Sequence, residues 1–350
     1  MSEFRNYQTE EREKGMETMD GLITVEHLHK SYQISKRSKG IPGMLANLVA
    51  PRYEKKEAVK DISFQIAEGE MVGFIGPNGA GKSTTIKMLS GILHPDSGQI
   101  LVDGKVPYRQ RKQYVGNIGV VFGQKSQLQW DLPVIDSFEL LKAIYRIPDQ
   151  TYKRNLARFT EMLDMQEFLK QPVRQLSLGQ RMRADIVAAL LHDPKIVFFD
   201  EPTIGVDVVG KETIRTFIQE LNAQDQITML FTTHDMQDIE KTCKRLLIID
   251  QGNKVYDGAL SGIREMYGTT RTLDLELQTE VQVAPIPHVT ISRPENSNSR
   301  KWQLQFDHHA VAVQELMGFL LATYPVRDLN ISEPEIESII RNIYGGRQPE

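Results

Sequence analysis

One stretch constrains this chain more than any other, because it fits the phosphate-binding pattern GxxxxGK[ST]: Gly76, Pro77, Asn78, Gly79, Ala80, Gly81, Lys82, Ser83 and Thr84. A short apolar run precedes it and a helix-forming run follows, which is the strand–loop–helix context that the pattern needs. The glycines allow backbone N–H groups to point into one concavity that a phosphate can fill. Lys82 would reach the β- and γ-phosphates, and the Ser83 hydroxyl would face Mg²⁺. An ordinary glycine-rich turn is the alternative, and the complete pattern in this context favours a nucleoside triphosphate site.

Composition excludes several other classes of protein. With 350 residues, 40% of them apolar and 25% charged, the chain is long enough for two or three domains with a sizeable core. The formal net charge of -4 gives no argument for nucleic-acid binding, and the single cysteine, Cys243, excludes an intrachain disulfide. No apolar run approaches the ~18 residues of a membrane-spanning helix, and the charged first residues are not a secretion signal. We expect a cytosolic protein that reaches a membrane only through a partner.

Continuous apolar runs alternate with helical segments over most of the chain, which predicts an α/β fold whose sheet is covered on both faces. Apolar spacings of three and four residues between 133 and 169 predict a block of helices. Residues 36–56 are expected to form a loop that holds a short amphipathic helix. The expected strands are residues 22–25, 57–64, 71–75, 98–102, 118–122, 196–199, 227–231 and 246–250.

The sequence changes character near residue 270, where alternating patterns predict half-exposed strands and a small α+β domain. Its expected strands are 272–277, 289–291, 302–306 and 326–331, its helices 310–323 and 333–344, and its turn 296–299. His308 and His309 are adjacent, and neighbours on a strand point to opposite faces, so we predict no metal site there. The domain boundaries predicted from these patterns are 1–20 for a flexible leader, 21–268 for the main domain with a helical subdomain at about 130–190, and 269–350 for the small domain.

Two acids follow the buried run 196–199. Asp200 and Glu201 would emerge at the carboxyl end of a strand, where ligands of α/β sheets bind. Without the phosphate loop upstream, two solvated surface acids would be the better interpretation.

Further short motifs accompany the phosphate loop and these acids, namely Tyr32, Gln124, the pentapeptide Leu176-Ser177-Leu178-Gly179-Gln180, Asp207 and His234. In this order and spacing, residues 22–262 resemble an ATP-binding-cassette (ABC) ATPase. The resemblance covers roughly two thirds of the chain. It implies a P-loop fold with a mostly parallel core sheet, an antiparallel part near the N-terminus and an inserted helical subdomain.

The resemblance implies ATP and Mg²⁺ as ligands and assigns a role to each matching residue. Asp200 would hold Mg²⁺ through water, Glu201 would polarise the attacking water, and Gln124 would contact both. His234 would contact the γ-phosphate and help to position Glu201. Tyr32 would stack on adenine, with a core tyrosine as the alternative. Taken alone, Gln124 would be an ordinary polar loop residue and His234 a structural histidine.

The pentapeptide resembles the family's signature LSGGQ, which caps an ATP molecule held by another subunit. Ser177, Gly179 and Gln180 match the residues assigned to the γ-phosphate, whereas Leu178 stands in place of a glycine, so the turnover rate is not predicted. Asp207 matches an acid that touches the opposite subunit. With one phosphate loop and one signature, a closed site needs a second copy of the chain or a related subunit, and a homodimer is expected.

The resemblance also implies work at a membrane. The chain would be the ATPase subunit of a transporter, bound to an integral membrane permease at the cytoplasmic side of the membrane and driving export. The lengthened loop 36–56 and the C-terminal domain resemble those of bacterial export systems. Trp130 either fills a groove of the permease or packs within its own subdomain.

Two other functions stay open. A soluble ABC-type ATPase switch of the repair type would need a long coiled coil, and the translation type would need two cassettes, neither of which the sequence contains. A scaffold that binds ATP without turnover is disfavoured because Asp200 and Glu201 are both present. We expect no nucleic-acid partner.

Overall fold

The computed structural model describes residues 21–35, 53–294 and 299–344, so the expected leader, the expected helix after residue 36 and most of the expected turn near 296 lie outside the described residues. The chain divides into two compact units, Met1–Asp257 and Gly258–Glu350, which are described separately. In the described part of the chain, no helix combines the length and the apolar character needed to cross a membrane.

A single nine-stranded sheet forms the first unit, in the order β4-β1-β2-β9-β8-β3-β7-β6-β5. Its centre is parallel: β3 lies between β7 and β8, and β6 lies between β5 and β7. Near the N-terminus, β1 pairs antiparallel with β2 and with β4. The expected fold class is thereby confirmed. The strands are β1 (Ile23–Ser35), β2 (Tyr53–Ile66), β3 (Met71–Ile75), β4 (Ser97–Val102), β5 (Ile118–Phe122), β6 (Ile196–Asp200), β7 (Thr228–Thr232), β8 (Arg245–Asp250) and β9 (Asn253–Ala259).

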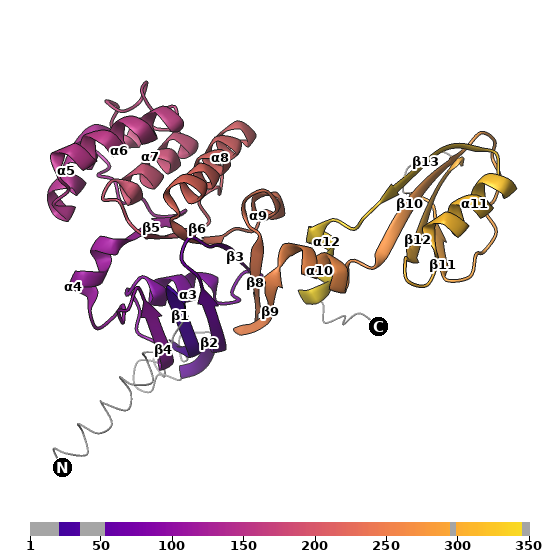
Figure 1. Ribbon diagram of the computed structural model, residues 1–350, viewed down its shortest axis with the longest axis horizontal. Helices are drawn as coiled ribbons and strands as arrows, with labels where there is room; N and C mark the ends of the chain where they lie inside the picture. The colour runs from indigo at the N-terminus through magenta and orange to yellow at the C-terminus, as the bar shows by residue number, and fades with distance from the viewer. Residues whose placement is uncertain (1–20, 36–52, 295–298, 345–350) are drawn as a thin grey trace, which may run out of the picture. The chain divides into compact units, whose positions relative to one another are not determined.

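The central strands are buried because both faces of the sheet are covered. All five residues of β3 and all five of β7 are buried, as the continuous apolar runs predicted. Figure 1 shows α5, α6, α7 and α8 gathered beside the β5 and β6 end of the sheet. The helical elements of this unit are α3 (Lys82–Leu89), α4 (Arg111–Tyr114), η1 (Val115–Asn117), α5 (Val134–Tyr145), α6 (Asp149–Met162), η2 (Val173–Gln175), α7 (Leu178–Leu190), α8 (Val208–Asp225) and α9 (Met236–Thr242).

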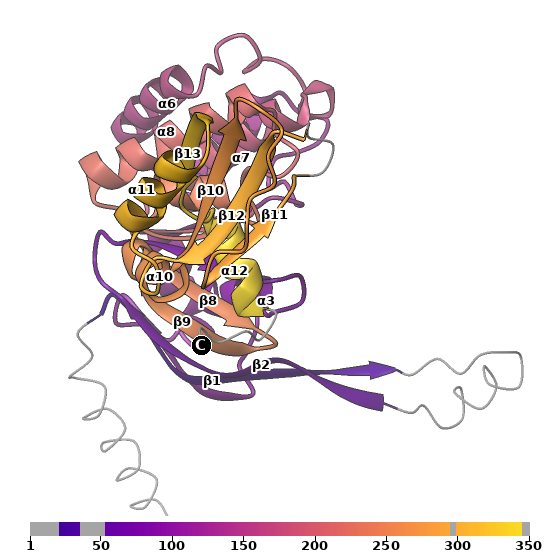
Figure 2. The same cartoon turned by 90° about the vertical axis from the view of Figure 1, so that its right-hand side faces the viewer.

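Strands β1 and β2 are much longer than expected, and they run together as a ribbon beyond the rest of their sheet (Figure 2). The second strand begins at Tyr53 rather than at residue 57, because its first residues pair with the end of β1. Residues 53–57 are all exposed, so no apolar pattern marked them as a strand. The ribbon carries Tyr32 opposite Lys56.

The second unit contains a four-stranded antiparallel sheet in the order β11-β12-β10-β13, with a core that includes Leu273, Phe306 and Leu320. The expected alternation is confirmed, since every second residue of β12 is buried. α12 begins three residues later than predicted because Glu333 precedes a proline, which disfavours helical backbone. The elements are α10 (Leu260–Tyr267), β10 (Thr270–Leu277), β11 (Val289–Ser292), β12 (Lys301–Asp307), α11 (Val313–Thr323), β13 (Val326–Ser332) and α12 (Ile336–Tyr344).

One premise of the sequence analysis is wrong in this unit. Because β12 ends at Asp307, His308 and His309 lie in a turn and not on a strand. Their rings are not on opposite faces, since the ring centroids are 4.1 Å apart. The two imidazoles can therefore face a common ligand.

Candidate active site

The phosphate loop joins β3 to α3 and depends on glycine at two points. Gly81 has a φ of 112°, and a Cβ there would lie 2.4 Å from the carbonyl oxygen of Ala58. A Cβ on Gly76 would lie 2.3 Å from the carbonyl oxygen of Ile249. No side chain caps the N-terminus of α3, so its first N–H groups face the loop concavity, which suits an anion.

Lys82 is almost fully buried at the end of this loop, with 6% of its surface exposed. Its Nζ donates to the carbonyl oxygens of Gly76, at 2.5 Å, and of Pro77, at 3.3 Å. Burial lowers the pKa of the Lys82 ammonium below its ordinary value, while the nearby carboxylates of Glu201 and Asp200 act in the opposite direction. The loop thus holds one amino group beside the space that a phosphate would fill.

Asp200 and Ser83 supply oxygen donors beside Lys82. The Ser83 hydroxyl donates to Oδ1 of Asp200 over 3.1 Å, and the Thr232 hydroxyl donates to the same oxygen over 2.9 Å. Asp200 is the last residue of β6, and Ser83 lies in the first turn of α3. A hydroxyl and a carboxylate so close together form a donor set that fits Mg²⁺.

Glu201 has an unusual backbone, with a φ of 57° in the left-handed region that disfavours residues other than glycine. Two hydrogen bonds hold it there, from its N–H to the carbonyl oxygen and to the hydroxyl of Thr232, each 3.1 Å long. Its Oε1 lies 3.8 Å from Nδ1 of His234. Such strain is kept where the surroundings over-determine it, and here it fixes the direction in which the side chain leaves the backbone.

Gln124 lies two residues after the end of β5, and its loop packs against the backbone of the two acids. The Gly123 N–H donates to the carbonyl oxygen of Asp200 over 2.7 Å. A Cβ on Gly123 would lie 2.2 Å from the carbonyl oxygen of Glu201, so only glycine allows this approach. The backbone itself brings Gln124 to the acids.

A cleft of about 840 Å³ gathers most of the predicted residues. They come from the loop, from β1, from the end of β5 and from the ends of β6 and β7: Tyr32, Asn78, Gly79, Gly81, Lys82, Ser83, Thr84, Gln124, Asp200, Glu201 and His234. Tyr32 is 37% exposed and is not a core tyrosine. The sequence analysis missed Ile34 and Lys56, which also line the cleft because they share the ribbon with Tyr32.

Other predicted residues do not line the cleft. Gly76, Pro77 and Ala80 belong to the loop but lie outside the lining. The signature lies elsewhere too, and its Ser177 and Gln180 side chains form a capping box at the start of α7.

Asp207 also lies outside the cleft and caps a helix. Its Oδ1 accepts from the Gly210 N–H over 2.7 Å at the start of α8. Gly179 also lies apart from the cleft. The single chain therefore contains a signature that is not used by its own cleft.

Leu178, which stands where the family signature has a glycine, lies against Gly205. Gly205 has a φ of 67°, and a Cβ there would lie 2.4 Å from a methyl carbon of Leu178. The absence of a side chain at position 205 leaves the space that Leu178 occupies.

Asp185 is a residue that the sequence analysis missed. It lies in α7, is 5% exposed, and its Oδ1 accepts from the Ser126 hydroxyl at 2.9 Å and from the Gln127 N–H at 3.0 Å. It therefore ties the signature helix to the segment just after Gln124. Burial raises the pKa of the Asp185 carboxyl to about 6. The available signal was an acid placed between Ala184 and the apolar run Ile186 to Leu191.

Asp185→Asn is expected to change how stability depends on pH. Folding raises the pKa of the Asp185 carboxyl, so folding is accompanied by uptake of a proton between about pH 4 and 6. The free energy of unfolding therefore falls as the pH rises through that window. The amide keeps an oxygen for both hydrogen bonds but does not ionise. Relative to the wild type, the variant should gain on the order of 2 kcal/mol between pH 4 and 7, measured by urea unfolding. Asp164→Asn, at an exposed position, is the control, and equal pH slopes for Asp185→Asn and wild type would contradict the prediction.

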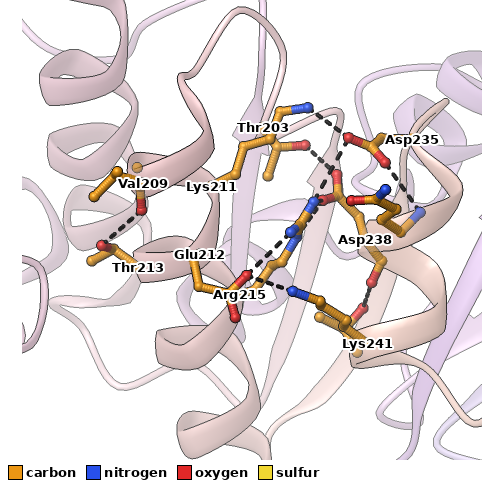
Figure 3. Close-up of polar contacts among 12 residues, drawn as sticks. Thr203, Val209, Lys211, Glu212, Thr213, Arg215, Asp235, Asp238 and Lys241 are labelled. Carbon is orange, nitrogen blue, oxygen red and sulfur yellow. Dashed lines mark hydrogen bonds and ion pairs between the residues drawn. The ribbon is translucent and has the colours of Figure 1, made fainter.

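Asp238 connects the loops that carry the two catalytic candidates. It is fully buried in α9, and its Oδ2 accepts from the hydroxyls of Thr203, at 2.5 Å, and Thr233, at 3.0 Å. Thr203 follows Glu201 closely, and Thr233 precedes His234. Figure 3 shows Arg215 of α8 pointing at Asp238, with which it forms a buried ion pair. This network sets the spacing of both loops.

Arg215→Ala should destabilise the first unit by about 3–5 kcal/mol, because it leaves the buried Asp238 carboxylate without its cation. ATPase activity at a permissive temperature should also fall, since the loops at Thr203 and Thr233 lose their common anchor. Thermal unfolding and phosphate release measure the two effects. Lys241→Ala removes only a surface ion pair with Glu212 and is the control. A variant as stable as the wild type would show that the pair is not structural.

The fold and the cleft together define a P-loop ATPase whose phosphate loop, acids, glutamine loop and histidine converge on one nucleotide site. The profile of the ABC transporter family matches residues 59–204. The chain is 34% identical over 228 residues to the ABC transporter ATP-binding protein NatA of Bacillus subtilis, covering 64% of this chain and 91% of NatA. The chain belongs to the family of ABC transporter ATP-binding proteins and is an ATP-binding ATPase of that family.

Two further relatives extend the comparison. The linearmycin resistance ATP-binding protein LnrL of Bacillus subtilis is 30% identical over 305 residues, covering 86% of this chain and 97% of LnrL. The alignment is longer than the first unit, so it includes part of the second. The Nod factor export ATP-binding protein I of Burkholderia orbicola is 36% identical over 214 residues, covering 60% of this chain and 69% of that protein.

Solved structures support the same assignment. The cassette MJ0796, in a dimeric post-hydrolysis state bound to ADP and Pi, is 25% identical, with a TM-score of 0.57 over 68% of this chain and 98% of that one. CbiO1 of Clostridium perfringens, part of the ABC transporter complex cbiONQ, is 26% identical, with a TM-score of 0.57 over 70% of this chain and 91% of that one.

Proposed function

We propose that this chain works as a pair of copies that bind ATP and Mg²⁺ between them and drive a separate membrane permease in export. One observation carries the proposal: the cleft of a single chain has the loop, the acids and the histidine, but its own signature residues lie outside it. A second copy would supply the missing signature. The dimeric state of MJ0796 supports this arrangement.

Within one cleft, each residue has a distinct task. Ser83, Gln124 and Asp200 would hold Mg²⁺, whose charge would offset that of the phosphates when it is bound. Lys82 would leave its loop carbonyls to pair with the β- and γ-phosphates. Tyr32 would stack on the adenine ring from the ribbon.

The hydrolytic step would depend on Glu201 and His234. Glu201 would orient the attacking water and polarise it toward the γ-phosphate, which is the task of a positioned base. His234, 3.8 Å from that carboxylate and 61% exposed, would contact the γ-phosphate once the site is filled.

Closure would come from the other copy. Ser177, Gly179 and Gln180 would meet the γ-phosphate in the partner's cleft through the start of α7, where the capping box already orders the backbone. Asp207 would face the junction between the copies. ATP would then stabilise the paired state, and hydrolysis would release it.

A partner of the helical segment is supported by exposed apolar side chains. Trp130 and Leu132 are 54% and 40% exposed. The guanidinium of Arg181 on α7 lies 5.8 Å from the centre of the Trp130 ring, so Trp130 contacts its own subdomain and still presents an exposed face. Leu140 and Ile144, on one face of α5, are 41% and 63% exposed. We propose that this segment docks a permease at the cytoplasmic face of the membrane. The export names of the relatives support the direction of transport.

A mild-detergent pull-down of the chain from native membranes tests the proposal. We expect one polytopic membrane protein at near-equal amounts, and a lower yield of it with Trp130→Ser. Trp302→Ser, in the core of the second unit, controls for a general loss of folding. Recovery without a membrane protein, or with ribosomes or DNA, would replace the transporter with a soluble ATPase switch.

A further inference from the structure

We propose that Asp307, His308 and His309 form a binding site for a divalent transition-metal ion of the zinc class, independent of the nucleotide cleft. The three residues end β12 and begin the turn that follows it. Each offers one ligand atom, and these atoms all lie within 4.8 Å of one another. An ion in this space could bind all three after small side-chain rotations.

The orientation of His308 is already fixed by the backbone. Its Nδ1 lies 2.7 Å from the carbonyl oxygen of Thr269. A carbonyl only accepts, so Nδ1 carries the proton and Nε2 keeps its lone pair for a ligand. Histidines that bind metals commonly donate their other ring N–H to a carbonyl or carboxylate in this way, which sets the tautomer and the ring plane. His309 is exposed and can rotate its ring toward the same point.

The Asp307 carboxylate is placed by the same turn. Its Oδ1 accepts from the backbone N–H of His309 over 2.8 Å. This bond brings the carboxylate over the turn that carries both imidazoles, and a carboxylate retains further lone pairs for a cation. The turn therefore restrains Asp307 and His308, and rotation of the exposed His309 ring completes the ligand set.

The pocket beside the ligands carries balanced formal charge. His308 and His309 line a pocket of about 310 Å³ that also contains Arg264, Arg271, Glu265 and Glu333. Arg271 forms a close ion pair with Glu333, and Nη1 of Arg264 lies 3.7 Å from the same carboxylate. The carboxylates of Glu265 and Glu333 thus balance the two guanidinium groups of the pocket. Asp307 lies outside the pocket lining and adds one negative charge to the three-residue cluster, which a cation would offset.

The donor types select the kind of metal. Two imidazole nitrogens with one carboxylate suit Zn²⁺, Co²⁺ or Ni²⁺, whereas Mg²⁺ and Ca²⁺ prefer oxygen donors alone. Three protein ligands leave one position of a tetrahedral ion for water or another group. The site would therefore hold an ion in exchange with its surroundings, and not one sealed into the core.

The test uses the full chain without affinity histidines, free of nucleotide, with excess Mg²⁺ to fill oxygen-only sites. Zn²⁺ is titrated against a chromophoric chelator, and Co²⁺ is followed by its visible absorption. We expect one equivalent of Zn²⁺ with a dissociation constant of about 10 µM or tighter. His308→Ala and His309→Ala should each weaken binding about 10-fold or more.

Two controls make the result decisive. His288→Asn removes an exposed histidine of the same unit outside the cluster, and asparagine tolerates its φ of 60°. Circular dichroism establishes that each variant is folded. Zn²⁺ should raise the thermal midpoint of the wild type and of His288→Asn but not of the double variant His308→Ala/His309→Ala. Equal Zn²⁺ affinity in the wild type and the double variant, or no binding by the wild type, would overturn the proposal.

Discussion

Replacing Glu201 by glutamine is expected to reduce ATP hydrolysis by about 100-fold or more while ATP binding stays near normal. The amide has the shape of the carboxylate but cannot polarise a water molecule in the same way. The two backbone hydrogen bonds to Thr232 that hold this residue are unaffected. Phosphate release measures turnover, and titration with a fluorescent ATP analogue measures binding.

The same variant also tests the pairing of copies. If hydrolysis releases the pair, Glu201→Gln with ATP should run as a dimer in size-exclusion chromatography and the wild type should not. Glu161→Gln, on α6 and outside the cleft, should behave as the wild type. Near-normal turnover in Glu201→Gln would show that Glu201 is not the catalytic base. An ATP-bound monomer would contradict the proposed pairing of copies.

Lys82→Ala is expected to weaken ATP binding by about 10- to 100-fold, because hydrogen bonds from a charged donor to phosphate are among the stronger ones. No other lysine reaches the carbonyl oxygens of Gly76 and Pro77 among the hydrogen bonds of the described residues. Equilibrium titration with ATP in the presence of Mg²⁺ measures the affinity. Hydrolysis at saturating ATP should fall as well, since the same amino group would stabilise charge on the γ-phosphate.

Lys82→Met separates charge from packing. Methionine fills much of the buried volume, so a defect shared by both variants belongs to the ammonium group. Lys60→Ala, on β2 and outside the cleft, should bind ATP as the wild type does. Unchanged affinity in both Lys82 variants would show that the loop binds phosphate through backbone N–H groups alone.

The sheet could be predicted because its central strands are continuous apolar runs between turn-forming residues. β9 could not, since it has no continuous apolar run and none of its residues is buried. The same reason explains the early part of β2, whose exposed residues form a strand only by pairing with β1. In both cases tertiary pairing, not local pattern, decides the structure.

The cleft was predictable where a motif combines residue type with spacing, as at Lys82 and Asp200. Asp185 and Asp238 were not, because an acid inside a helix shows no partner in the sequence. His308 and His309 show the opposite failure, in which a correct rule for strands was applied one residue beyond the end of a strand. A single sequence shows neither which residues meet across the fold nor the exact residue at which a helix or strand ends.

Leu178 and Gly205 are close enough for substitutions at the two positions to influence each other. A residue with a Cβ at position 205 must adopt a φ of 67° and displace the Leu178 methyl group, and the second cost exists only while leucine occupies position 178. The effect of one mutation thus depends on the residue already present at the other position. Because the displaced atom is the end of a flexible side chain, the cost of a Cβ at position 205 depends on how far the leucine can rotate away. The effects of substitutions at positions 178 and 205 are therefore expected to be non-additive.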